Sequence, residues 1–109
     1  MRGFTDRVLL QSAAAATANG AVINVAGMST CGVQVTGTFS ATVTFEATIN
    51  GADWVAIPFT NIASGASATT ATAAGLYRTT VSGLVGLRAR ISTYGSGNVT
   101  ADALAITGV

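Results

Sequence analysis

Few side chains in this sequence could do chemistry, and their types exclude most catalytic arrangements. The chain has no histidine and a single cysteine, Cys31. It therefore cannot form a Ser-His-Asp or Cys-His catalytic arrangement, and it lacks the ligands of a transition-metal site. The chain has four carboxylates, Asp6, Glu46, Asp53 and Asp102. Nothing in the spacing of these residues brings two of them to the separation that glycoside hydrolysis needs. The sequence predicts a protein that is not an enzyme, with no catalytic residues, cofactor or metal.

Trp54 is the only tryptophan, and it allows two interpretations. Together with Tyr94 it could form an exposed platform on which a sugar ring stacks, as in carbohydrate-binding β-sandwiches. Alternatively, because it directly follows a predicted turn, it caps the core, as large aromatic side chains usually do. Glycan binding through Trp54 and Tyr94 is therefore an alternative hypothesis.

The arginines are candidates for contacts with another protein. Arg88 and Arg90 project from one side of a predicted strand, and Arg78 could lie near them. Arginine is suited to interface ion pairs with carboxylates, although two solvated charges would give the same pattern. A net charge of +1 argues against general nucleic-acid binding. No run approaches the roughly 18 consecutive apolar residues of a membrane-spanning helix, so we expect neither nucleic acid nor membrane as a partner.

The elements that must position these residues centre on a predicted hairpin over residues 42–59. Val43, Phe45, Ala47 and Ile49 alternate with the polar residues Thr42, Thr44, Glu46 and Thr48, which is the period of a half-buried strand. The dipeptide Asn50-Gly51 favours the positive φ angles of a tight reversal, after which residues 54–59 return. The pattern places the first set in the core and leaves the polar set, including Glu46, on an outward face.

Short strands with turns every few residues continue along the chain, and no helix is predicted. Further strands are expected over residues 4–11, 21–26, 31–38, 76–81, 87–92 and 99–106, with part of the low-complexity segment 64–75 as an edge strand. Residues 94–98 are predicted to be a turn. In the last strand the large residues change sides at Leu104 and Ile106, which predicts a bulge or an exposed end. About eight short strands indicate a single-domain, antiparallel all-β sandwich of jelly-roll type over residues 19–109, preceded by an arm or first strand over residues 1–18.

The amino-acid composition indicates whether neighbouring molecules cover the surface of this domain. Half of the residues are apolar but only 8% are charged, against roughly a quarter in ordinary soluble domains. Such a chain is either a neutral soluble β protein or a subunit covered by neighbours, and exposed neutral area favours the second. The lone Cys31 cannot form an internal disulfide. Residues 8–10 are too short for the apolar region of about 7–15 residues that a secretory signal needs, so none is expected.

Several phrases of the sequence resemble small virion proteins of tailed bacteriophages. The resemblance covers nearly the whole chain and is carried by VLLQSAA (8–14), VQVTGTF (33–39), ATVTFE (41–46), NGADWVAI (50–57), GLYR (75–78), VSGL (81–84) and RARI (88–91). It implies a small β-sandwich subunit that serves as a decoration, cement, fibre-base or tail component. Such proteins commonly act as homo-oligomers or in repeated lattice positions, and the resemblance supplies no catalytic residues.

The resulting prediction is a non-enzymatic structural component of a phage virion, assembled in the cytoplasm of the bacterial host. We expect a capsid decoration or cement subunit that binds itself and the major capsid protein. A tail or baseplate component, or the carbohydrate-binding module above, is the alternative. The candidate interface residues are Phe4, Arg7, Thr42, Thr44, Glu46, Arg78, Arg88 and Arg90.

Overall fold

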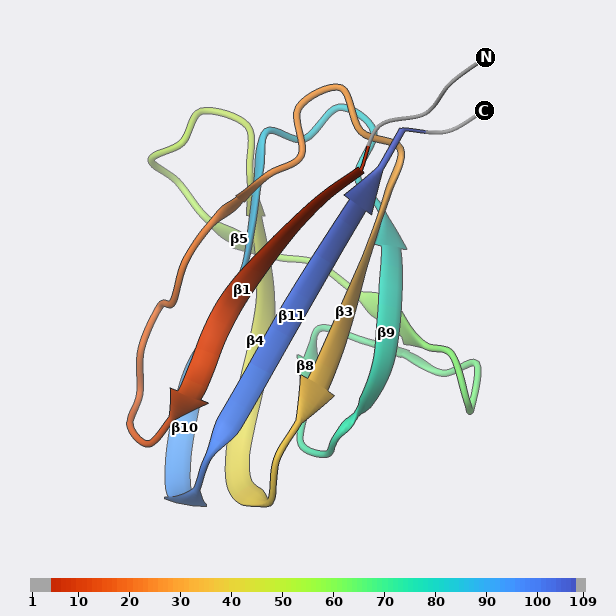
Figure 1. The fold of residues 1–109 in the computed structure, drawn as a ribbon. Helices are drawn as coiled ribbons and strands as arrows, with labels where there is room; N and C mark the ends of the chain where they lie inside the picture. Colours follow the sequence, from red (N-terminus) through yellow and green to blue (C-terminus); the bar gives the residue numbers. More distant parts are fainter. Residues whose placement is uncertain (1–4, 108–109) are drawn as a thin grey trace.

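A computed structural model describes residues 5–107 as two antiparallel β-sheets packed face to face (Figure 1). The described residues contain no helix, and the prediction of an all-β sandwich is confirmed. There are eleven strands where about eight were expected, because several edge strands have only two or three residues. The strands are β1 (Thr5–Ala14), β2 (Ile23–Asn24), β3 (Thr30–Thr36), β4 (Phe39–Thr48), β5 (Val55–Ala56), β6 (Phe59–Asn61), β7 (Ser67–Ala68), β8 (Thr70–Ala71), β9 (Gly75–Thr80), β10 (Gly86–Gly97) and β11 (Val99–Ile106).

The front sheet, nearest the viewer in Figure 1, has the strand order β1-β11-β3-β9-β6-β7. The back sheet has the order β2-β10-β4-β5, and β8 also pairs with β4. All of these pairings are antiparallel. Strands that are far apart in sequence therefore lie side by side, with the last strand, β11, between β1 and β3.

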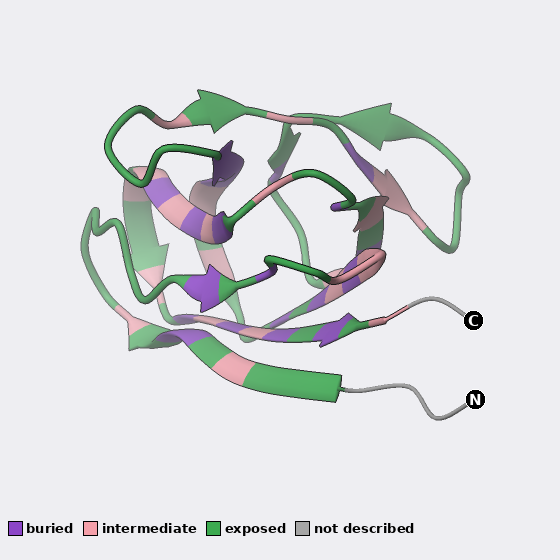
Figure 2. Cartoon of the chain, turned by 90° about the horizontal axis from the view of Figure 1, so that it is seen from above, coloured by how far each residue is buried: buried purple, intermediate pink, exposed green. Residues whose placement is uncertain are grey.

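Alternating residues of both sheets fill the space between them. Figure 2 shows buried and exposed residues alternating along the long strands of both layers. At the centre, the rings of Phe45 and Phe59 stack with centroids 4.3 Å apart, and the Tyr77 ring lies 5.5 Å from Phe45. Three aromatic rings meet here, while alanine, valine, leucine and isoleucine fill most of the rest of the core.

The two sheets are also joined by a buried amide. Gln11 lies on β1, where a register shift disturbs the pairing with β11. Its side-chain nitrogen donates hydrogen bonds to the carbonyl oxygens of Ala89 on β10 (2.9 Å) and Ala18 (3.1 Å). Because a buried polar group is stable only when its hydrogen bonds are made, these contacts fix β1 against the back sheet.

The predicted hairpin forms with a wider connection than expected. Val43, Phe45 and Ala47 face the core as predicted, but Ile49 is 68% exposed, so its inward assignment is wrong. The strand ends at Thr48 because the side-chain oxygen of Asn50 accepts hydrogen bonds from the backbone amides of Ala52 and Asp53. This Asx-type turn ends the alternation, and the returning strand β5 has only two residues.

Three further predictions from the sequence pattern can be compared with strand pairing and exposure. Residues 94–97, predicted as a turn, belong to β10, because β4 pairs with them as far as Phe39. The segment 64–75 contributes the edge strand β7 and the short strand β8, which confirms that part of it pairs. Leu104 and Ile106 are 46% and 38% exposed, which confirms the exposed end predicted for the last strand.

Candidate interaction faces

A cluster of charged side chains covers the outer face of the back sheet. Glu46 on β4 accepts hydrogen bonds from Arg88 Nε (2.8 Å) and Arg90 Nε (3.2 Å) on the adjacent strand β10. The Glu46 side chain is only 10% exposed and that of Arg88 16%, whereas Arg90 is 37% exposed. The two arginines predicted as interface donors therefore already have a carboxylate partner within their own chain.

Trp54 lies on this same outer face. The guanidinium carbon of Arg88 is 4.3 Å from the centre of the Trp54 ring, in the range of a cation–π contact. Gly86 makes room for the ring: a Cβ there would lie 3.3 Å from Trp54 Cη2. The alternative that Trp54 caps the core is therefore wrong, because the ring packs on the outside of the sheet.

The structure does not bring the two candidate glycan-binding aromatics together. Tyr94 lies six residues beyond Arg88 along β10, which places it about 20 Å from the Trp54 contact. Its hydroxyl donates a hydrogen bond to the carbonyl oxygen of Gly97 (2.9 Å). Both rings are partly buried, and one face of Trp54 is taken by Arg88.

The threonine-rich face of β4 is largely covered by the chain itself. Thr44 and Glu46 are only 9% and 8% exposed, so the prediction that they form an open outward face is wrong. The Thr44 hydroxyl is 2.7 Å from that of Ser92 on β10, and β8 pairs with β4 beside it. Alternation placed these residues opposite the core but could not reveal that neighbouring strands and arginines cover them. Thr42 is half-buried on the same face.

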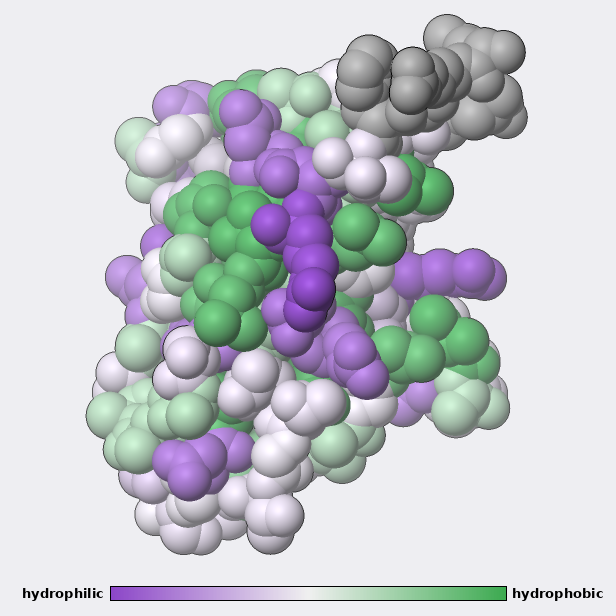
Figure 3. All heavy atoms as spheres, viewed as in Figure 1, coloured by the Kyte–Doolittle hydropathy of each residue, from purple (hydrophilic) through white to green (hydrophobic). Residues whose placement is uncertain are grey.

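The outer face of the front sheet presents exposed aliphatic side chains. We define this aliphatic face by Leu9, Ile62, Leu76, Leu104 and Ile106, which are between 38% and 50% exposed. They come from β1, β9, β11 and the residue after β6, and they are brought together by the strand order of the sheet. Figure 3 shows hydrophobic residues on this side, separated by a band of hydrophilic side chains.

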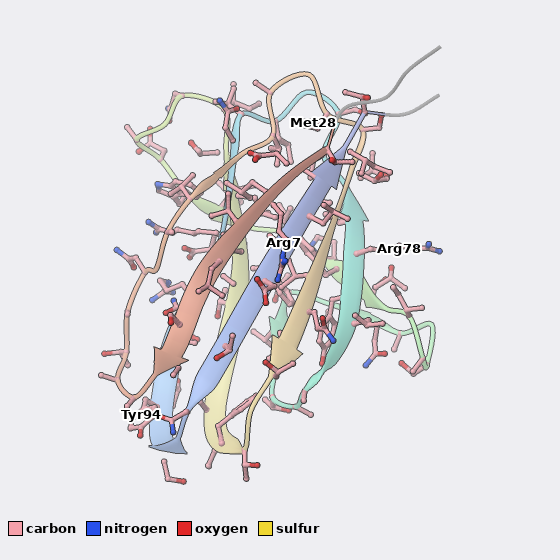
Figure 4. The ribbon with its side chains drawn as sticks, viewed as in Figure 1. Arg7, Met28, Arg78 and Tyr94 are labelled. Carbon is pink, nitrogen blue, oxygen red and sulfur yellow. The ribbon has the colours of Figure 1, made fainter. Side chains whose placement is uncertain are left out.

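Two arginines project from the aliphatic face. Arg7 on β1 forms an ion pair with Asp102 on β11 (3.3 Å), and its side chain is 71% exposed. Arg78 on β9 is exposed and has no ion-pair partner among the residues that the structure describes. In Figure 4 the Arg7 side chain lies over β11, while Arg78 points away from the sheet. Phe4, the other candidate interface residue near β1, lies outside the described residues.

A hollow of about 320 Å³ opens on this face beside Arg7 and Leu104. Gly32 on β3 lines the hollow and pairs with Leu104 on one side and, on the other, with Arg78, which does not itself line the hollow. Arg7 pairs with Leu104 in turn, so one row across the sheet reads Arg7, Leu104, Gly32, Arg78. Leu76, Ile62 and Gln34 complete the walls of the hollow.

Only part of this face is found by sequence reasoning. Arg7 and Arg78, which were predicted at an interface, lie on the aliphatic face, whereas Leu9, Gly32 and Leu104 were not proposed. The change of sides at Leu104 was the available signal, because it placed a large aliphatic residue opposite the core. The partners of Leu104 on β1 and β3 could not be identified without the strand order.

Potential metal ligands and the single thiol are the remaining reactive groups to place among the described residues. No group of three or more potential metal ligands occurs among residues 5–107. Cys31 is fully buried, and burial raises the pKa of its thiol to about 12, so it is not a nucleophile at neutral pH. No helix in this part of the chain is long and apolar enough to cross a membrane. Fold and faces together define a small all-β module with one charged, self-covered face and one aliphatic face.

The chain belongs to the XepA family, whose model matches residues 4–105. Among solved structures, the SPBc2 prophage-derived protein YomS superposes with a TM-score of 0.91 at 16% identity, over 98% of this chain and 96% of YomS. The PBSX exported protein XepA superposes with a TM-score of 0.93 at 16% identity. That alignment covers 98% of this chain but only 39% of XepA, so this chain spans well under half of that protein.

A more distant similarity is to a chain from Bacillus endospore appendages, which form a family of disulfide-linked pili. It superposes with a TM-score of 0.50 at 17% identity, over 95% of this chain and 85% of that one. No curated protein matches the sequence significantly. At these identities the structural similarities establish the fold, and the family assignment rests on the sequence model.

Proposed function

We propose that the chain is a non-enzymatic structural component of a phage particle. The family assignment and the fold shared with proteins described as prophage-derived and PBSX-exported support this origin. More specifically, it acts as a capsid decoration or cement subunit that binds copies of itself and the major capsid protein. The observation that carries the proposal is the aliphatic face, since a sheet that leaves five aliphatic side chains half exposed is typical of a contact surface.

The size of this face predicts weak contacts that must be repeated. Fully burying one aliphatic side chain contributes about 1.5–3 kcal/mol, so covering five that are already half buried contributes on the order of 5 kcal/mol. The loss of translational and rotational freedom on association cancels a similar amount. A single contact would therefore be transient, and stable attachment would come from many copies held at once, as on a capsid lattice.

A tail or baseplate location is the second candidate. The observation that favours it is the description of the structurally similar XepA as an exported protein, which does not suit a subunit retained in a capsid shell. In either location the aliphatic face would make the contacts, so the two candidates differ in the partner and not in the surface.

Particle association tests the proposal directly. Phage particles purified on a density gradient would be probed with an antibody against the chain, and intact particles would be imaged to locate it. We expect a fixed ratio of this chain to the major capsid protein, and a Leu104→Asp variant should be lost from the particles. The matched control is Ile49→Asp, because Ile49 is exposed but lies off the aliphatic face. Absence of the wild-type chain from particles would overturn the proposal.

A further inference from the structure

Gly32, at the centre of the aliphatic face, is not required by the backbone. It is absent from the glycines with positive φ, and an added Cβ would meet only the carbonyl oxygen of Tyr77 at 3.7 Å. Alanine would therefore fit, and glycine within a strand is destabilising by roughly 0.5–1 kcal/mol relative to alanine. Glycine in a strand often marks a place where another molecule approaches the backbone closely.

The shape of the hollow over Gly32 suits a side chain better than a cofactor. Its volume of about 320 Å³ is at the lower end of the roughly 300–1,000 Å³ of small-molecule sites. Leu104, Leu76 and Ile62 supply aliphatic walls, and the open side faces away from the sandwich. An aliphatic side chain inserted there would contact Leu104 and Leu76 and would cover the exposed backbone of Gly32.

The charges near the hollow determine which partner residues can flank the inserted side chain. Arg7 and Arg78 lie in the same row as Gly32, on opposite sides of it. Asp102 neutralises only Arg7, and Arg78 has no carboxylate partner within the described range. The charges that line the hollow therefore cancel, and the positive charge next to it is that of Arg78, on the strand beside Gly32. A carboxylate next to the inserted side chain would pair with Arg78, whereas a lysine or arginine there would be repelled.

We infer that the hollow over Gly32 binds a segment of a partner protein that presents an aliphatic side chain next to an aspartate or glutamate. This inference rests on the proposed function, because it specifies the chemistry of the partner surface that the aliphatic face recognises. Gly32 provides the space, Leu104 and Leu76 provide the apolar walls, and Arg78 provides the charge selection. Arg7 contributes less, since Asp102 already balances its charge.

The test uses the whole chain and a phage-displayed library of random dodecapeptides as the probe. The library would be selected on the immobilised wild-type protein after depletion on a Gly32→Leu variant. We expect the enriched peptides to share a leucine, isoleucine or valine next to an acidic residue. Binding of a fluorescently labelled peptide, measured by anisotropy, should weaken about tenfold in Gly32→Leu, as for a filled hot-spot pocket.

Two further variants separate the hollow from general damage to the fold. Arg78→Glu should reduce the affinity for acidic peptides and raise it for matched peptides with lysine in place of the acid. Thr36→Leu places a leucine on the outer side of the same strand, away from the residues that line the hollow, and should leave binding unchanged. Amide NMR spectra of each variant would verify that the sandwich is intact.

Each outcome is decisive. Peptides without an acidic residue, binding that is indifferent to Gly32→Leu, or no enrichment at all would overturn the inference. So would a wild-type oligomer, detected by light scattering, that Gly32→Leu converts to a monomer, because a second copy would then occupy the hollow. The proposed function is tested separately: a chain that enters particles but selects no acidic peptide would refute only this inference, and the reverse result would refute only the particle role.

Discussion

Replacing Glu46 by glutamine should destabilise the protein more than any change at an exposed ion pair. Glu46 accepts hydrogen bonds from Arg88 and Arg90 on the outer face of the back sheet. The contact with Arg88 is better shielded from solvent than the contact with Arg90. Glutamine keeps the shape of the side chain and one acceptor oxygen. Its amide group, however, turns N–H groups toward a guanidinium that also carries only donors.

The magnitude follows from the two exposures. A hydrogen bond to a charged group contributes about 1.5–3 kcal/mol when shielded, and the Arg88 contact, at 2.8 Å and 16% exposure, belongs in the middle of that range. The Arg90 contact is 3.2 Å long and Arg90 is 37% exposed, so it adds only about 0.5 kcal/mol. Because glutamine retains part of one contact, we expect Glu46→Gln to lower the free energy of unfolding by about 2 kcal/mol.

Urea denaturation followed by circular dichroism would measure this loss, and the midpoint of thermal unfolding should fall by about 10 °C. The matched control is Asp102→Asn, which breaks an ion pair whose arginine is 71% exposed and should cost no more than about 0.5 kcal/mol. The double variant Glu46→Leu with Arg88→Met should be more stable than Glu46→Leu alone, because it leaves no unpaired charge at the Arg88 position. A loss in Glu46→Gln no larger than in Asp102→Asn would refute the reasoning.

Three other predictions concern the core, a turn and the cysteine. Phe45→Ala should lower the free energy of unfolding by about 3–5 kcal/mol in urea denaturation, because it removes the ring that contacts both Phe59 and Tyr77; a loss below that of Phe45→Leu would contradict this. Gly97→Ala should cost about 3 kcal/mol, because Gly97 has a φ of 84° and an added Cβ would overlap the carbonyl oxygen of Thr38, whereas Gly27→Ala, at a φ of 80° in open space, should cost only about 1–2 kcal/mol. Burial raises the pKa of Cys31 from 9.0 to about 12, so the folded protein holds the thiol proton more tightly than the unfolded chain does. The free energy of unfolding is therefore unaffected by ionisation of this thiol below pH 9.0, and it falls by about 1.4 kcal/mol per pH unit from there to about pH 12. Denaturation at pH 8 and pH 11 should show a steeper fall in wild type than in Cys31→Ala, and equal slopes would count against the buried thiol.

The inward half of the fold could be predicted from the sequence because it depends on local alternation. Val43, Phe45 and Ala47 lie in the core as their period of two requires, and Val33 and Val35 on β3 do the same. An all-β architecture follows from several such segments with no helical period. None of this needs to know which strand lies beside which.

The outward half could not be predicted in the same way. Alternation places Glu46 opposite the core, but its burial depends on Arg88, which the register of β4 and β10 brings across from it. The extension of β10 through residues 94–97 has the same origin, because pairing with β4 overrides the turn propensity of its glycine and serine residues. The aliphatic face likewise requires β11 to lie between β1 and β3, an order that no local pattern encodes.

The distribution of the few charges distinguishes the two faces of the sandwich. Glu46 pairs with two arginines on the back sheet, Asp102 pairs with Arg7, and Asp53 accepts a hydrogen bond from Asn50. These carboxylates therefore brace the chain internally and contribute little free charge to its surface. Arg78 and the carboxylate of Asp6 differ, since both are exposed and neither has an ion-pair partner among the described residues. A partner attracted to Arg78 would approach the front sheet, and the aliphatic side chains beside it would be buried in the same contact. The same few charges would thus stiffen the back sheet and orient the subunit with its front sheet toward its neighbour.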